Sequence, residues 1–202
     1  MILPVDISIS YTLKTVLLGS CFLGITSGVL GCFATLRKQS LIGDAIAHAS
    51  LPGITIMFLF TQTKNSLFLL IGAAIAGWIG TLFISLISNY SQIKKDAALG
   101  ITLSSFFGLG IVFLTYIQKL PTASKSGLDS YLFGNASTLL FEDVVIICVL
   151  SIINLIIVCL CWKEFKLISF DPTFASSIGL STKKIDTLLT ILIVTTIVIG
   201  LQ

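Results

Sequence analysis

The recurrence of long apolar runs is the feature that most constrains how this 202-residue chain folds. A helix needs about 20 residues to cross a hydrocarbon core of about 30 Å. Five such runs occupy residues 11–35, 44–62, 66–89, 97–118 and 143–162. A sixth begins near residue 187. We therefore expect about six transmembrane helices in a single domain that covers residues 1–202.

The composition supports a membrane protein. Hydrophobic residues make up 55% of the chain and charged residues only 10%, and the mean hydropathy is +1.07. A chain with so little polar surface does not form a water-soluble globule. Because the apolar runs are long rather than short and alternating, the sequence predicts an all-α polytopic transmembrane bundle in a lipid bilayer and not a barrel. The net charge of +3 does not indicate nucleic acid, because its basic residues gather between the apolar runs.

The distribution of basic residues predicts the orientation. Alternate loops hold most of the Lys and Arg residues: Arg37, Lys38, Lys94, Lys95, Lys163, Lys166, Lys183 and Lys184. The positive-inside rule places these loops in the cytoplasm and the N-terminus outside. The sixth run reaches Gln202 without flanking polar residues, so we also expect a C-terminally truncated sequence.

The chain's one histidine, His48, follows Asp44 by four residues in the second apolar run. Side chains at this spacing share a helix face, with Cβ atoms about 5–6 Å apart. An imidazole nitrogen and a carboxylate oxygen at that separation can bind one divalent cation. An ionisable group within a membrane span costs about 2.5–3.5 kcal/mol on insertion scales, so such residues usually mark an ion path. Asp44 and His48 are therefore candidate metal ligands, to which other ligands must be added.

A structural interpretation of the same pair stays open. Asp44 would then cap the helix, and His48 would satisfy a hydrogen bond in the core. The neighbouring Pro52-Gly53 dipeptide favours the ion path, because Pro52 has no N–H to bond to the carbonyl of His48. That carbonyl is left free, and we expect a helix kink at Pro52 and Gly53.

The loop between the fifth and sixth runs has the signals of a short helix. Asp171 is a favourable N-cap, Pro172 suits the first helical position, and Gly179 suits a left-handed C-terminal cap. Phe174 and Ile178, four residues apart, give the helix one apolar face. Because a helix this short has little stability of its own, we expect it to dock either on a partner subunit or on the membrane surface.

Four segments together resemble the permease subunits of bacterial zinc, manganese or iron ABC importers, the ABC-3 metal permease family. They are Leu36–Gly53, Asp96–Ile101, Leu132–Asn135 and Phe170–Gly179. The first is the most specific, because it has a basic pair, Gly-Asp, His and Pro-Gly in fixed order at the start of a span. The last is similar to the loop by which such permeases engage their ATPase, with Ala175 and Gly179 at the expected positions. The resemblance thus implies an ATPase-coupling loop that holds Phe170, Asp171, Pro172, Phe174, Ala175 and Gly179.

The resemblance implies a homodimeric or paired permease in the bacterial inner membrane, with an ion path at the subunit interface. It also implies a cytoplasmic ATP-binding subunit, an external metal-binding protein, and more spans than this sequence holds. The sequence has no phosphate-binding Gly-x-x-x-x-Gly-Lys loop, so we expect a transporter subunit that is not itself an enzyme. No cofactor is expected beyond the transported ion. Manganese, zinc and iron stay open, because one His with one Asp does not select among them.

Two other functions stay open. A secondary metal transporter would work without ATP, and it would need a proton-coupling carboxylate deep in a later span. The six runs hold no such residue beyond Asp44. A non-transporting membrane scaffold would use Asp44 and His48 structurally. Binding of an ATP-hydrolysing subunit at Phe174 and Gly179 distinguishes the importer from both.

Overall fold

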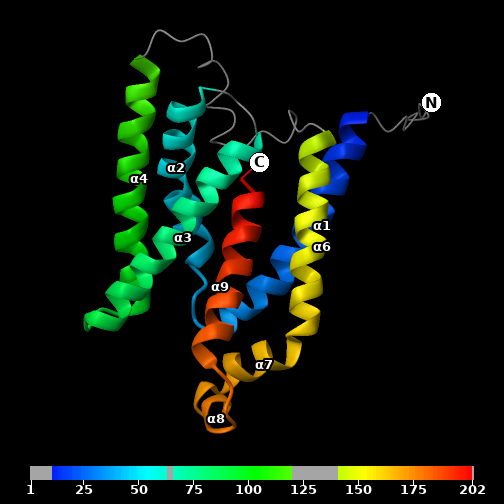
Figure 1. The fold of residues 1–202 in the computed structure, drawn as a ribbon, viewed down its shortest axis with the longest axis vertical. Coiled ribbons are helices and arrows are strands. Elements are labelled where there is room, and N and C mark those ends of the chain that lie inside the picture. The colour runs from blue at the N-terminus through cyan, green and yellow to red at the C-terminus, as the bar shows by residue number, and fades with distance from the viewer. Residues whose placement is uncertain (1–10, 63–65, 120–140, 202) are drawn as a thin grey trace, which may run out of the picture.

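The structure is a computed structural model that describes residues 11–62, 66–119 and 141–201. These residues form helices and no strands, which confirms the all-α prediction (Figure 1). The helices are α1 (Tyr11–Leu36), α2 (Ile42–Thr61), α3 (Ser66–Tyr90), α4 (Lys95–Lys119), α6 (Phe141–Leu160), α7 (Trp162–Phe170), α8 (Pro172–Ser177) and α9 (Thr182–Ile199).

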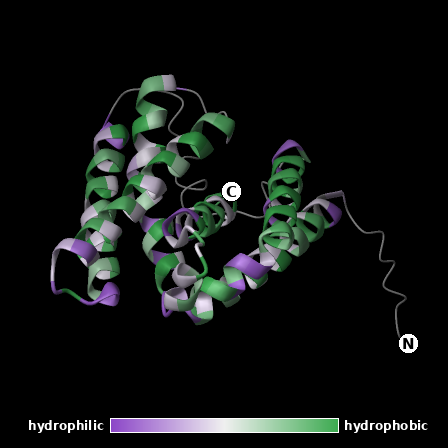
Figure 2. Ribbon diagram, turned by 60° about the horizontal axis from the view of Figure 1, so that its bottom comes forward, coloured by the Kyte–Doolittle hydropathy of each residue, from purple (hydrophilic) through white to green (hydrophobic). Residues whose placement is uncertain are grey.

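Five of the helices, α1, α2, α3, α4 and α6, are long and apolar enough to cross a membrane. Their bounds agree with the five expected runs to within a few residues. Apolar residues cover most of their length (Figure 2). The sixth run corresponds to α9, which begins earlier than expected and carries Lys183, Lys184 and Asp186 in its first turns. The chain is thus a multi-pass membrane protein.

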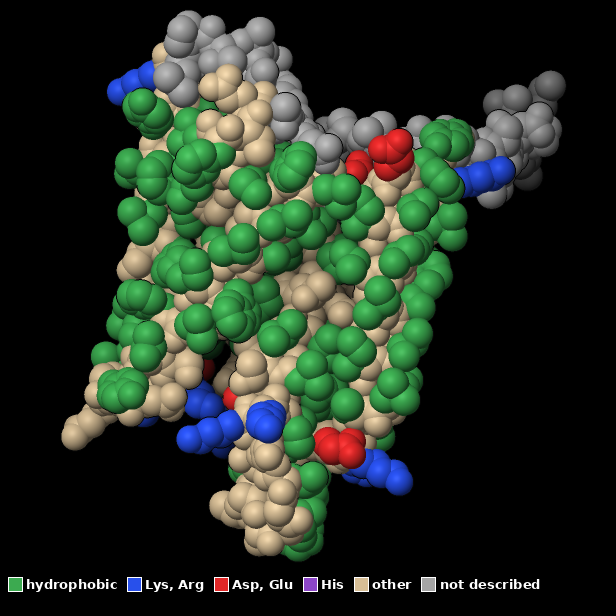
Figure 3. Space-filling model, viewed as in Figure 1, with side chains coloured by type: hydrophobic (Ala, Val, Ile, Leu, Met, Phe, Trp, Pro, Cys, Tyr) green, Lys and Arg blue, Asp and Glu red, His purple; other side chains and the backbone are tan. Residues whose placement is uncertain are grey.

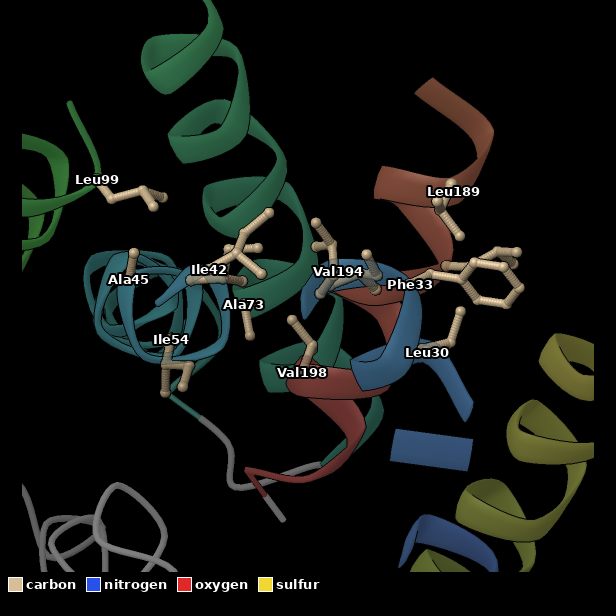
Figure 4. Close-up of a cluster of buried hydrophobic side chains, with 14 of the residues drawn as sticks. Leu30, Phe33, Ile42, Ala45, Ile54, Ala73, Leu99, Leu189, Val194 and Val198 are labelled. Atoms are coloured by element: carbon tan, nitrogen blue, oxygen red, sulfur yellow. The ribbon is translucent and has the colours of Figure 1, made fainter. Parts of the chain in front are cut away.

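The helices form two groups that α9 joins. In the first group α2 packs against both α3 and α4, and in the second α1 packs against α6. Helix α9 contacts members of both groups. Its Val194 and Val198 lie beside Leu30 and Phe33 of α1 and Ala73 of α3, and all five are buried (Figure 4). Burial of this apolar cluster fixes the position of α9 in the bundle.

A buried polar contact also joins α6 to α9. Asn154 Nδ2 of α6 donates a hydrogen bond to Thr196 Oγ1 of α9 at 2.9 Å. Both side chains are buried. Such bonds between apolar helices hold them in a defined register, since an unpaired amide in this environment is costly.

Helix α7 is an element that the sequence reasoning did not predict. The fifth run was expected to reach residue 162, but α6 ends at Leu160 and a new helix begins at Trp162. Phe33 of α1 makes edge-to-face contacts with Trp162 and Phe165, at ring-centroid distances of 5.3 and 6.0 Å. The last turns of α1 therefore hold α7, which leads the chain to α8.

The basic connections share one end of the bundle. The α1–α2 connection, the α3–α4 connection and the α7–α8 segment all lie at the lower end in Figure 1. Figure 3 shows Lys and Arg side chains gathered there. This arrangement agrees with the charge pattern of the sequence, while the cytoplasmic location of this end stays a prediction.

Candidate functional site

Asp44 and His48 lie one turn apart on α2, and their polar atoms face each other. His48 Nε2 is 3.3 Å from Asp44 Oδ1. The His48 side chain is 40% exposed and the Asp44 side chain 63% exposed. The pair is therefore accessible to an ion or to a second chain, rather than sealed in the core.

Asp44 does not cap α2, as the structural interpretation of this pair required. The N-cap of α2 is Leu41, which makes no side-chain capping bond, and Asp44 stands further along the first turn. Its carboxylate can still interact favourably with the helix dipole. The ring of His48 packs edge-on against Phe107 of α4, with centroids 4.9 Å apart and an interplanar angle of 77°. This contact positions the imidazole ring by aromatic packing.

Sequence reasoning missed Phe107. A single phenylalanine in an apolar run gives no signal of its own, and only the packing of α2 on α4 brings it to His48. The bundle thus adds an aromatic neighbour to the candidate pair.

The candidate site offers two ligands from this chain. Among the described residues, no three His, Cys, Asp or Glu side chains come together as a metal-binding group. A carboxylate with an imidazole suits manganese, iron or zinc, and each of these ions takes four or more ligands in a stable site. Water or a second chain would have to supply the others at the exposed face of the pair.

Helix α2 continues through Pro52 from Ile42 to Thr61. Thr55 Oγ1 donates hydrogen bonds to the carbonyls of Pro52 and Leu51, at 2.9 and 3.1 Å. The expected kink stays a prediction. Gly53 has a different role that the structure does show, because a Cβ there would lie 2.1 Å from the carbonyl oxygen of Gly72 in α3. The backbones of α2 and α3 are therefore in direct contact at Gly53.

We expect Gly53→Ala to destabilise the bundle strongly. The added methyl group meets a backbone oxygen that cannot rotate away, so α2 and α3 must separate. Overpacking in a tight interior typically costs about 1–3 kcal/mol, and a rigid neighbour puts this case at the upper end. The test is the thermal unfolding midpoint in detergent. Gly28→Ala in α1 is the control, because a Cβ there meets nothing within 4 Å; equal midpoints for the two variants would refute the contact.

The short helix expected after residue 170 is present as α8. Asp171 is its N-cap: Oδ1 accepts a hydrogen bond from the Phe174 N–H at 2.9 Å and one from Thr173 Oγ1 at 2.6 Å. The first of these bonds is the main reason why the pKa of Asp171 lies below its ordinary value. The predicted helix start is therefore confirmed.

The end of α8 is also as predicted. Gly179 has a φ of +84°, in the left-handed region that favours glycine. Its N–H bonds to the carbonyl of Ser176, and the N–H of Leu180 bonds to the carbonyl of Ala175. These two bonds form a Schellman motif, which turns the chain sharply from α8 towards α9.

Helix α8 and the residues on either side of it carry exposed apolar side chains. Ala175 is fully buried, whereas Phe170, Phe174 and Ile178 are more than half exposed. Helix α8 contacts α7 and α9 and extends below them in Figure 1. An exposed apolar cluster at the charged end of a membrane protein is typical of a contact surface.

Of the other two motif segments, the structure describes one. Asp96–Ile101 forms the start of α4, where Ala98 and Leu99 are buried in the packing against neighbouring helices. Leu132–Asn135 lies outside the described residues.

Comparison with known families decides the relationship. Residues 10–202 match the family described as the ABC 3 transport family. The chain belongs to this family. Within the ABC 3 family it is 51% identical over 187 residues to the manganese transport system membrane protein MntC of Bacillus subtilis, and it covers 43% of that protein. It is 45% identical over 192 residues to the zinc transport system membrane protein TroC of Treponema pallidum, and it covers 64% of that one. These matches take in 93% and 95% of this chain.

A solved structure has the same fold as this chain. PsaBC from Streptococcus pneumoniae, in complex with a Fab, matches with a TM-score of 0.79 and 32% sequence identity. The match covers 95% of this chain and 66% of that chain. The present chain thus spans less than two thirds of the length of the curated relatives above and about two thirds of this structure.

Proposed function

We propose that this chain is the membrane-spanning permease part of an ABC importer for a divalent transition metal ion. The observation that carries the proposal is the accessible Asp44–His48 pair on a membrane-spanning helix of an ABC 3 family member. One relative is named for manganese transport and another for zinc transport. Manganese, zinc and iron are the candidate ions, and the transport crosses the bacterial inner membrane.

The pair suits transient binding of an ion. A cation that reaches α2 exchanges part of its water shell for a carboxylate oxygen of Asp44 and an imidazole nitrogen of His48. Because these atoms lie 3.3 Å apart, one ion can contact both. Phe107 limits rotation of the imidazole ring by its edge-on contact. A site with only two protein ligands from one chain binds weakly enough to release its ion, and a second copy of the permease can add ligands.

We assign the energy supply to a separate subunit. A cytoplasmic ATP-binding subunit docks on the apolar cluster of Phe170, Phe174 and Ile178 and hydrolyses the ATP. An external metal-binding protein delivers the ion to the opposite end. The N-terminus is outside in this arrangement, which is supported by the gathering of Lys and Arg at the end that holds α8 (Figure 3).

The described acidic residues favour the importer over a proton-coupled secondary transporter. Within the described membrane-spanning helices they occupy first turns: Asp44, Asp96, Glu142 and Asp143. A proton-coupling carboxylate is needed deeper in a span.

Metal accumulation in a bacterial strain that lacks its own importers tests the proposal. This chain is co-expressed with an ATP-binding subunit and a metal-binding protein of the same family, and manganese, zinc and iron are supplied separately. We expect uptake of at least one ion, and we expect it to stop when the ATP-binding subunit is inactivated. Uptake that persists after this inactivation would favour the secondary transporter instead.

A further inference from the structure

An ion pair between a nearly buried arginine and a half-exposed aspartate joins the end of α1 to the start of α9. Arg37 is the first residue after α1, and its side chain is only 11% exposed. Its Nη2 pairs with Oδ1 of Asp186, which stands in the second turn of α9. Burial lowers the pKa of Arg37, but an arginine in contact with a carboxylate stays charged. The Asp186 side chain is 47% exposed, so solvent screens part of the attraction between the two charges. Loss of the carboxylate would still leave the nearly buried guanidinium without its partner, so the pair favours contact between the two segments.

The backbone on the Arg37 side is short and hydrogen-bonded. Lys38 has a φ of 56°, its N–H bonds to the carbonyl of Thr35, and the N–H of Gln39 bonds to the carbonyl of Ala34. These bonds close α1 with a Schellman motif. The N–H of Ile42 then bonds back to the carbonyl of Gln39, and α2 begins. Asp44 follows two residues later, so a displacement of Arg37 is transmitted to the first turn of α2.

The backbone on the Asp186 side is equally short and bonded. The Schellman motif at Gly179 and Leu180 ends α8. The N–H of Thr182 bonds to the carbonyl of Leu180, and the N–H of Ile185 bonds to the carbonyl of Ser181. The connection between α8 and α9 is short and hydrogen-bonded, so a displacement of α8 moves Asp186.

We propose that the Arg37–Asp186 pair is the link through which movement of α8 reaches the Asp44–His48 site. Arg37 is thus a positioning residue that acts through the α1–α2 turn. The inference rests on the proposed function, in which α8 is the docking helix for the ATP-binding subunit. The neighbouring Lys38 is exposed, and no salt bridge to it is found among the described residues, so the coupling belongs to Arg37 alone.

The test uses this chain in complex with its ATP-binding subunit, reconstituted in liposomes. A fluorophore at Ser40→Cys, with the five native cysteines replaced by alanine, reports nucleotide-dependent movement of the α1–α2 turn. ATP hydrolysis and uptake of manganese, zinc or iron are measured on the same preparations. The variants are Arg37→Gln, Asp186→Asn, the charge swap Arg37→Asp with Asp186→Arg, and Lys38→Gln as the control.

Coupling between two sites typically changes the affinity at one of them by about 5–150-fold. We therefore expect each single neutralisation to reduce the probe response and the uptake at least about tenfold. ATP hydrolysis and copurification of the subunit should stay within about twofold. The charge swap should restore much of the response, and Lys38→Gln should match the wild type.

Three outcomes would overturn the link. The first is a neutralised complex with an unchanged probe response, and the second is a wild-type probe that does not respond to nucleotide. The third is joint loss of the response and of subunit copurification without rescue by the swap, which would mean a purely structural pair. Failure of the proposed function is seen separately, as a wild-type probe that responds while none of the three ions is taken up.

Discussion

Replacement of either Asp44 or His48 by alanine should abolish metal uptake. Each substitution removes one of the two ligands that this chain supplies, and the remaining side chain alone holds a cation poorly. Loss of a residue that merely supports a metal ligand typically costs about 10–100-fold, so loss of a ligand itself should cost at least about 100-fold. The measurement is accumulation of radioactive manganese or zinc in the importer-deficient strain described above.

The chain offers a matched control for Asp44. Asp96 is also an exposed aspartate in the first turn of a membrane-spanning helix, α4, but the structure shows no histidine paired with it. Asp96→Ala removes the same charge from a helix N-terminus, so it should reduce uptake only slightly. Membrane levels of all variants are compared by immunoblot. Normal uptake by Asp44→Ala or by His48→Ala would remove that residue from the ligand set.

The membrane-spanning helices were predictable because run length is a strong local signal. A stretch of about 20 apolar residues has few alternatives to a spanning helix. Helix α7 lacked this signal. It has nine residues, and Phe165 and Ile168, its buried apolar residues, stand among Lys163, Glu164 and Lys166. Two turns are too few for helical periodicity to emerge from such a mixed segment, and its partner Phe33 is distant in the sequence.

The candidate site divides in the same way. The closeness of Asp44 and His48 follows from helix geometry alone, and the caps of α8 follow from Asp171 and Gly179, since each depends on neighbours within one turn. The contact of Phe107 with His48 depends on the packing of distant segments. The contact of Gly53 with Gly72 depends on distant segments in the same way, and it stands beside the untested prediction of a kink. A local sequence pattern does not show which distant helix packs against a given residue.

Replacement of Phe174 by alanine should release the ATP-binding subunit. Phe174 is 53% exposed, and Phe170 at the end of α7 and Ile178 at the end of α8 are exposed as well. Truncation of a central aromatic residue at an interface commonly costs about 2 kcal/mol or more, a weakening of roughly 30-fold. Alanine is compatible with the helix, so α8 itself should persist. The measurement is copurification of the subunit with tagged permease, together with its dissociation constant.

Tyr90→Ala is the matched control for Phe174. Tyr90 is an exposed aromatic residue at the end of α3, at the same end of the bundle as α8 (Figure 1). Its truncation should leave copurification unchanged. Gly179→Val should act like Phe174→Ala, because a β-branched residue tolerates the φ of +84° poorly and the end of α8 would be displaced. Wild-type copurification of both variants would argue against docking at α8. Loss of the subunit from these variants, with its retention by Asp44→Ala, would separate the docking surface from the ion site.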